Sequence, residues 1–251
     1  MNCMLIFFII LLSPVGLYAE TKSNWNIAGI RLGEEPTKVE AAIQKEFPNF
    51  KYKKSVHSFQ HKGFRLPEIY LGYDAYNPVG DYDRSDYIQT FFSVQDPTIL
   101  ISIARHMNFT IEKNLPTFSA IKTSLIEKYG QWQLEYKWGH VLYLYWFDGT
   151  PEKYRNENFL KKRLSPDRAS LSSIHEGVVD YCGGLEKNLG IVMRAELTLD
   201  QNNFVVFMNY ELTNYPEAWK SCSDVWEMLN TGINNKLQED SSNGDLVKPK
   251  L

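Results

Sequence analysis

The chain has 251 residues, of which 43% are hydrophobic and 14% aromatic, and its formal net charge is −3. A chain of this length and composition can bury one large hydrophobic core or two small ones, so a disordered protein is not expected. Acidic and basic residues are mixed along the sequence and nearly balance. This balance argues against nucleic acid, and against an anionic membrane surface, as the main partner.

The start of the chain has the pattern of an export signal. An unbroken apolar run over residues 4–12 precedes the first charged residue, Glu20, so we predict a signal peptide cleaved after Ala19 and a periplasmic or secreted mature protein. An uncleaved anchor is the alternative, because residues 1–3 contain no Lys or Arg and Leu17 is large for its place before the cleavage site. About nine apolar residues span roughly 13 Å as a helix, well short of a bilayer core of about 30 Å, so no transmembrane span is expected in the mature chain.

Cysteine usage agrees with export. Cleavage would remove Cys3 and leave two cysteines, Cys182 and Cys222. An even number in an exported protein favours a disulfide, which here would close a loop of about 40 residues and stabilise the fold by roughly 3 to 4 kcal/mol. The alternative is a nucleophilic thiol at Cys182 with His175 nearby in sequence, a weaker interpretation in an oxidising compartment.

The first predicted element is a strand, a glycine turn and a helix start within residues 29–39. An apolar stripe that includes Val39, Ile43 and Phe47 predicts a helix over 36–47, with Pro36 in its first turn. Short aromatic or β-branched segments then alternate with Gly, Pro, Asp or Asn, which predicts strands of an antiparallel sheet over residues 57–61, 68–73, 87–94 and 99–104.

The second half repeats this order of elements. A helix is expected over 115–130, with Gly130 at its end. Four further elements follow, namely a strong strand, the two strands of a hairpin and a last helix, over residues 141–147, 191–199, 204–212 and 216–237. In the first hairpin strand, polar and apolar residues alternate, which places Val192, Arg194, Glu196 and Thr198 on one face.

The first two helices favour an internal repeat. The apolar stripe at residues 39, 43 and 47 matches residues 121, 125 and 129. One interpretation is a tandem repeat of an α+β unit of about 80 residues, and the alternative is a pair of unrelated helices. We expect an α+β fold with one or more antiparallel sheets and the helices packed on one face. The predicted organisation is a signal peptide, a first unit, a second unit with the C-terminal helix, and a disordered tail, over residues 1–19, 20–110, 111–237 and 238–251.

Three segments carry a resemblance to a known group of proteins. They are AGIRLGEEPTKVEAAI at 28–43, PTFSAIKTSLIEKYG at 116–130 and YCGG at 181–184. Together they resemble uncharacterised periplasmic proteins of Gram-negative bacteria. The first segment resembles more loosely the SmpA/OmlA (BamE-like) outer-membrane assembly lipoproteins, and the architecture resembles the tandem-repeat β-lactamase inhibitor proteins. The resemblance implies an envelope protein that acts by binding, although the chain lacks a lipid-bearing cysteine after its leader.

No catalytic or metal site is predicted. The sequence contains no nucleophile elbow, P-loop or zinc-protease motif. His57 and His61 are expected on a strand, where four residues separate them by about 13 Å, too far for one metal ion. We therefore predict no catalytic residues, no metal and no cofactor. An enzyme, such as a hydrolase whose site is assembled from dispersed residues, is the alternative.

The best predicted interaction surface is rich in tyrosine. Five tyrosines alternate with Asp74, Asp81, Asp83 and Asp86, and they are Tyr70, Tyr73, Tyr76, Tyr82 and Tyr87. Tyrosine offers a large contact area and a hydroxyl at low entropic cost, which suits a protein or glycan partner. The alternative is an ordinary loop between strands. We expect a binding or envelope-assembly module with an envelope or secreted protein partner, or a secreted factor that acts on a host or competitor protein.

Overall fold

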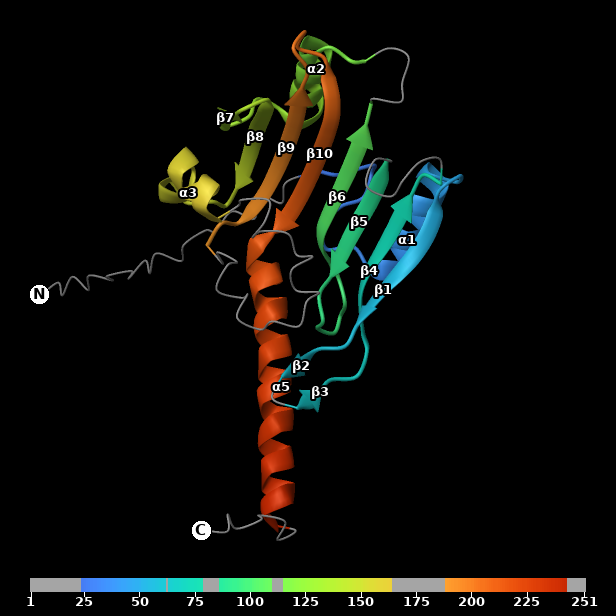
Figure 1. Cartoon of the computed structure of the whole chain (residues 1–251), viewed down its shortest axis with the longest axis vertical. Helices are drawn as coiled ribbons and strands as arrows, with labels where there is room; N and C mark the ends of the chain where they lie inside the picture. Colours follow the sequence, from blue (N-terminus) through green and yellow to red (C-terminus); the bar gives the residue numbers. More distant parts are fainter. Residues whose placement is uncertain (1–23, 62, 79–85, 110–114, 164–187, 243–251) are drawn as a thin grey trace, which may run out of the picture.

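The computed structural model describes residues 24–61, 63–78, 86–109, 115–163 and 188–242. Within these ranges the chain forms an α+β fold, in which a long C-terminal helix packs against one antiparallel sheet of eight strands (Figure 1). The predicted α+β class and antiparallel sheet are confirmed. The predicted signal peptide lies outside the described residues, so its cleavage stays a prediction.

The first half of the fold is a helix followed by strands. Helix α1 (Pro36–Glu46) precedes β1 (Lys51–His57), the short hairpin of β2 (Gln60–His61) and β3 (Phe64–Arg65), and then β4 (Ile69–Tyr76), β5 (Tyr87–Phe92) and β6 (Leu100–Asn108). The second half opens with α2 (Phe118–Tyr129). It continues with β7 (Leu134–Trp138), β8 (Val141–Asp148), the 3₁₀ turn η2 (Glu152–Tyr154), α3 (Glu157–Arg163), β9 (Ile191–Leu199), β10 (Val205–Asn214) and α5 (Tyr215–Ser242).

The two halves share one sheet. Its strand order is β1-β4-β5-β6-β10-β9-β8-β7, so each half contributes four neighbouring strands. The halves meet where β6 pairs with β10, along a register that sets Arg105 opposite Tyr210 and His106 opposite Asn209. The two predicted α+β units therefore contribute to one continuous sheet.

Helices cover both faces of this sheet. On one face, Val39 and Ile43 of α1 and Leu125 of α2 join the central core. On the opposite face, Leu160 of α3 and Ala218 of α5 pack against other side chains of the sheet. The prediction that the helices share one face holds for α1 and α2 and is wrong for α3 and α5, because strand alternation also sends large apolar side chains to the second face.

A tight turn fixes the chain in front of α1. Ile27 and Ile30 are buried and exchange two backbone hydrogen bonds of 3.1 and 3.0 Å. The two residues between them, Ala28 and Gly29, have φ angles of 53° and 78°. Two successive positive φ angles define a type I′ turn, which glycine adopts freely and alanine at some cost. The segment predicted as a strand before Gly33 therefore forms this tight turn instead, and the turn anchors the start of the chain on the core.

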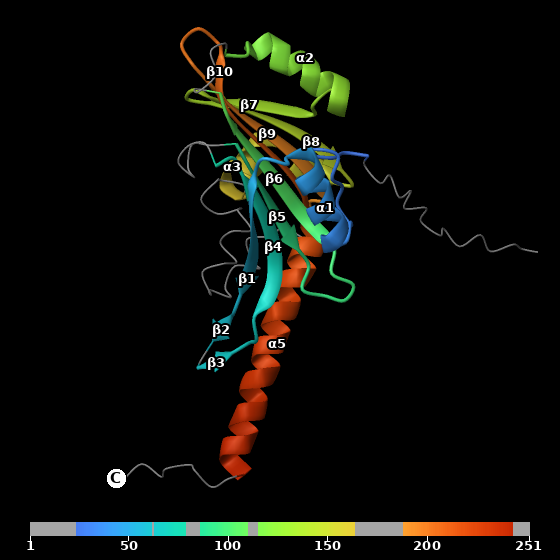
Figure 2. The same cartoon turned by 90° about the vertical axis from the view of Figure 1, so that its right-hand side faces the viewer.

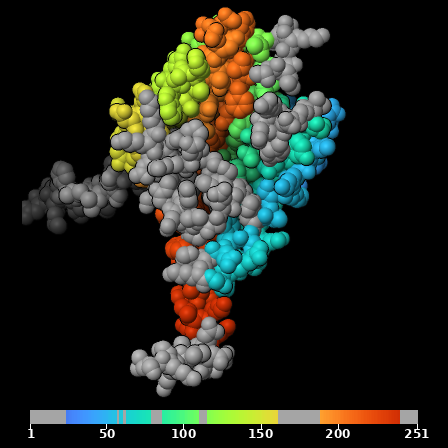
Figure 3. Space-filling model, in the orientation of Figure 1, coloured from blue at the N-terminus to red at the C-terminus, as the bar shows by residue number. Residues whose placement is uncertain are grey.

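Helix α5 extends well beyond the sheet (Figures 1 and 2). Its 28 residues measure about 42 Å at 1.5 Å per residue. Val225 and Leu229 pack against residues of β4 and of the β2–β3 hairpin, which lies beside the helix in the space-filling view (Figure 3). The helix continues to Ser242, five residues past the predicted helix end at 237, and the rest of the predicted tail lies outside the described residues.

We expect Gly232→Ala to destabilise the protein, although alanine favours a helix by about 1 kcal/mol. A Cβ atom at Gly232 would clash with the Phe64 ring. Overpacking of this kind costs about 1 to 3 kcal/mol, so the expected net loss is about 1 kcal/mol in the free energy of unfolding by urea. Thr231→Ala, at an exposed neighbouring position, is the control. A Gly232→Ala variant as stable as the wild type would contradict the contact.

Candidate functional site

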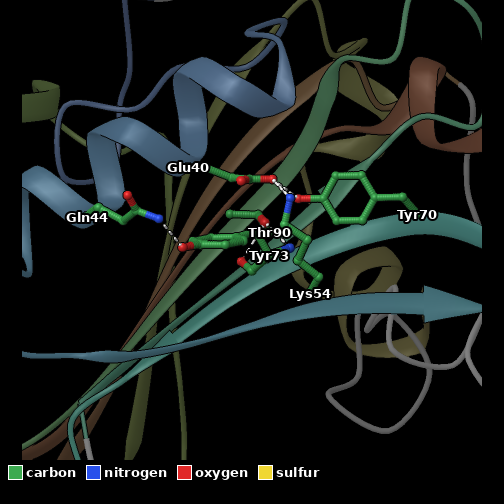
Figure 4. Close-up of polar contacts among 6 residues, drawn as sticks. All are labelled: Glu40, Gln44, Lys54, Tyr70, Tyr73 and Thr90. Carbon is green, nitrogen blue, oxygen red and sulfur yellow. Dashed lines mark hydrogen bonds and ion pairs between the residues drawn. The ribbon is translucent and has the colours of Figure 1, made fainter.

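Two of the predicted surface tyrosines attach α1 to the sheet (Figure 4). The Tyr70 hydroxyl donates a hydrogen bond of 2.6 Å to the Glu40 carboxylate. The Lys54 ammonium group lies 3.0 Å from the same carboxylate and 5.3 Å from the centre of the Tyr70 ring. Burial, and then the hydrogen bond to Glu40, raise the pKa of Tyr70 above its usual value. The hydroxyl is therefore a stable donor that holds the helix in place.

Tyr73 lies deeper, with 3% of its surface exposed. Its hydroxyl accepts a hydrogen bond of 2.7 Å from the Gln44 side chain, and its backbone N–H and C=O both contact the Thr90 hydroxyl. Tyr73 is thus out of reach of a partner protein. Tyr76 and Tyr87 are half-buried on β4 and β5, and Tyr82 lies outside the described residues. Among the described residues, Tyr76 and Tyr87 are cross-strand neighbours, whereas Tyr70 and Tyr73 contact α1, so the tyrosine-rich binding surface stays a prediction.

A polar pocket lies at the central seam of the sheet, on the face that α1 and α2 cover. Its volume is about 170 Å³. The lining residues come from the turn before α1, from α2 and from the paired strands β6 and β10, and they are Ile27, Ala28, Arg105, Met107, Ser124, Leu125, Lys128, Tyr129 and Tyr210. The turn is held over the seam because the Tyr129 hydroxyl donates a 2.9 Å hydrogen bond to the backbone oxygen of Asn26.

The pocket offers hydrogen-bond donors that no described residue engages. Arg105 donates through Nε and Nη2 to the Asp86 carboxylate, at 3.2 and 2.9 Å, which leaves the N–H groups of Nη1. Lys128, exposed at the pocket mouth, lies 5.1 Å from the Tyr129 ring and has no ion-pair partner within the described ranges. The Tyr210 hydroxyl likewise has no partner among them. The lining therefore offers the Lys128 ammonium group, the Nη1 group of the ion-paired Arg105 and the Tyr210 hydroxyl, and it contains no carboxylate.

Electrostatics in the pocket favour a negatively charged ligand. Partial burial, and then the nearby charge of Arg105, lower the pKa of Lys128, while Glu46 acts in the opposite direction. An anion between Lys128 and Arg105 would relieve their mutual repulsion. Burial raises the pKa of Tyr210 to about 12, so its hydroxyl remains protonated and able to donate at neutral pH.

A second polar cluster lies on the opposite face of the same strands. Arg194 of β9 and Glu211 of β10 are cross-strand neighbours and form an ion pair of 2.7 Å. Glu211 also accepts a 3.1 Å hydrogen bond from the Thr213 hydroxyl, which in turn lies 2.7 Å from the Ser102 hydroxyl. Only 8% of Arg194 is exposed, so this network is part of the protein interior.

The other predicted sites are only partly placed by the structure. Cys222 is buried on α5, with 7% of its surface exposed. Cys182 and His175 lie outside the described residues, so the Cys182–Cys222 disulfide stays a prediction. Among the described residues, no group of three or more His, Cys, Asp or Glu could hold a metal ion. No described helix is long and apolar enough to cross a membrane.

The fold and the pocket together define a single-sheet α+β protein with a polar pocket at its central seam. No family model, curated protein or solved structure matches the chain.

Proposed function

We propose that the protein is an exported, non-enzymatic binding protein whose ligand is a small organic anion. The observation that carries this proposal is the combination, in one pocket, of Arg105, Lys128 and Tyr210 with no carboxylate on the wall. These groups offer donors that suit a carboxylate, and the charge-assisted hydrogen bonds they would form are stronger than neutral ones. The apolar wall of Ile27 and Leu125 suits a short hydrocarbon body.

The volume of the pocket limits the size of the ligand. At about 170 Å³ the pocket is smaller than typical ligand pockets of about 300 to 1,000 Å³, so it suits a ligand of only a few non-hydrogen atoms. A short-chain carboxylate such as butyrate has this size. Its carboxylate would lie between Arg105 and Lys128, and its hydrocarbon chain against Ile27, Met107 and Leu125.

The repeat interpretation supports this location. We propose that the two halves are tandem copies of one unit, a helix followed by four strands, since the sheet order is mirrored about the β6–β10 pair. In this view the pocket belongs to the seam between the copies. The same proposal includes the export signal, the disulfide, the likeness to BamE-like lipoproteins and an envelope or secreted protein partner. An envelope protein would meet small anions that diffuse through the periplasm.

Titration calorimetry with butyrate tests the function. We expect saturable binding to the wild-type protein, and a loss of about tenfold in affinity for Lys128→Met, which keeps the length of the side chain and removes its charge. Lys122→Met is the matched control, because Lys122 lies on the same helix, over the Trp132 ring and outside the pocket. Equal affinities for the two variants, or no binding to the wild type, would refute the proposal.

A further inference from the structure

Three polar side chains form one row across the middle of the sheet, on the face opposite the pocket. Glu196 of β9 is the cross-strand neighbour of Asn209 of β10, and Asn209 is the neighbour of His106 of β6. Neighbours of this kind have Cβ atoms about 4.5 to 5.5 Å apart. The row continues to Tyr143 beside Glu196 and to Tyr87 beside His106.

The row presents one buried hydrogen-bond acceptor that no described residue satisfies. Asn209 is 9% exposed, and its Oδ1 atom has no hydrogen-bond partner among the described residues. A buried acceptor without a donor is costly, so such atoms are rare in folded proteins. Burial, and then the charge of Arg194, lower the pKa of His106 to about 4. The imidazole is therefore neutral at pH 7, with one nitrogen that can accept a hydrogen bond.

The described charged groups around the row sum to a single negative charge when Glu196 is ionised. Arg194 and Glu211 neutralise each other across 2.7 Å. Glu196 lies beside this pair. Burial raises the pKa of its carboxyl group, and the nearby charge of Arg194 opposes this effect only in part. A cation near Glu196 would offset its desolvation and stabilise the charged carboxylate.

We propose that Glu196, Asn209 and His106 form a binding site for a small organic molecule that carries a primary ammonium group. An ammonium group has one positive charge, three N–H donors and no acceptor, which complements three acceptors and one negative charge. None of these residues lines the anion pocket, so this site stands independently of the proposed function.

The experiment compares ethylammonium with tetramethylammonium, because both carry one positive charge and only the first has N–H donors. We expect ethylammonium to shift the side-chain ¹⁵N resonances of Asn209 and His106 in a saturable manner. Tetramethylammonium is expected to bind at least about tenfold more weakly. Equal effects of the two ions, or no shift with either, would overturn the proposal and leave water as the partner of Asn209.

Variants separate binding from stability. Asn209→Leu removes the unsatisfied amide and keeps the volume similar, so we expect it to fold with an unfolding midpoint at or above that of the wild type. Its affinity for ethylammonium should fall about tenfold. Thr198→Val, on the same face of β9 and outside the row, is the control and should bind as the wild type does. Unchanged ethylammonium affinity in Asn209→Leu would contradict the site.

Discussion

Glu211→Gln is expected to lower the free energy of unfolding by about 3 kcal/mol. The substitution keeps the shape of the side chain and removes the negative charge that lies 2.7 Å from the Arg194 guanidinium. Breaking a buried ion pair by neutralising one partner costs about 3 to 5 kcal/mol, because the other charge remains buried. The lower end of this range applies, since Glu196 lies two residues from Arg194 on the same face of β9 and still attracts it.

Urea unfolding at pH 7 measures this effect. Glu135→Gln, at an exposed position of β7, is the control and should change stability by less than about 0.5 kcal/mol. A double variant, Arg194→Leu with Glu211→Leu, removes both charges and should be more stable than Glu211→Gln alone. If Glu211→Gln were no less stable than Glu135→Gln, the ion pair would contribute nothing and the interior position of Arg194 would need another explanation.

The helices and most strands could be predicted from the sequence because local patterns determine them. The stripe of Val39, Ile43 and Phe47 predicts α1 almost to the residue, and the apolar run at 141–147 predicts β8. Strand β1 was missed at residues 51–55, since three lysines in that stretch conceal its alternation. Strand β1 is an edge strand that pairs only with β4. An edge strand can keep charged residues such as these lysines exposed.

The interior network was not predictable from one strand. Arg194 and Glu196 do alternate with apolar residues, and such alternation usually marks a solvent-exposed face. Here that face is also covered, through Tyr215 at the start of α5 and Leu160 of α3. The pattern therefore identifies the face correctly but cannot show that the face is buried. The alternation indicates a buried polar network only once it is known that α3 and α5 cover this face.

The pocket was missed for a different reason. Arg105, Lys128 and Tyr210 come from three elements and have no characteristic spacing. They meet because β6 pairs with β10 and α2 crosses above that pair. The same pairing places His106 and Asn209 on the opposite face, since adjacent residues of a strand point to opposite sides. One strand pair thus supplies residues to both candidate sites, back to back, and only the tertiary register reveals this.

His106 should make the protein less stable as the pH falls from 6.5 to 4. The ring stacks on Tyr87 at 4.0 Å, faces Phe207 and Asn209 of β10, and senses the charge of Arg194 from β9. Burial, and then Arg194, lower its pKa from 6.5 to about 4. Above pH 6.5 the residue is neutral in both the folded and unfolded states, so it has no effect. Below that, the unfolded chain takes up the proton first, and stability falls by about 2 kcal/mol by pH 5.

Unfolding by urea at pH 7, 6 and 5 tests this expectation in three proteins. His106→Phe keeps the stacked ring and removes the proton-binding group, so its loss of stability between pH 7 and pH 5 should be about 2 kcal/mol smaller than that of the wild type. His140→Gln, at an exposed position of the turn before β8, should behave as the wild type does. Carboxylates also titrate near pH 4, but they affect all three proteins alike, so the difference between His106→Phe and His140→Gln isolates His106. Identical pH dependence in these two variants would show that the imidazole is not buried as described.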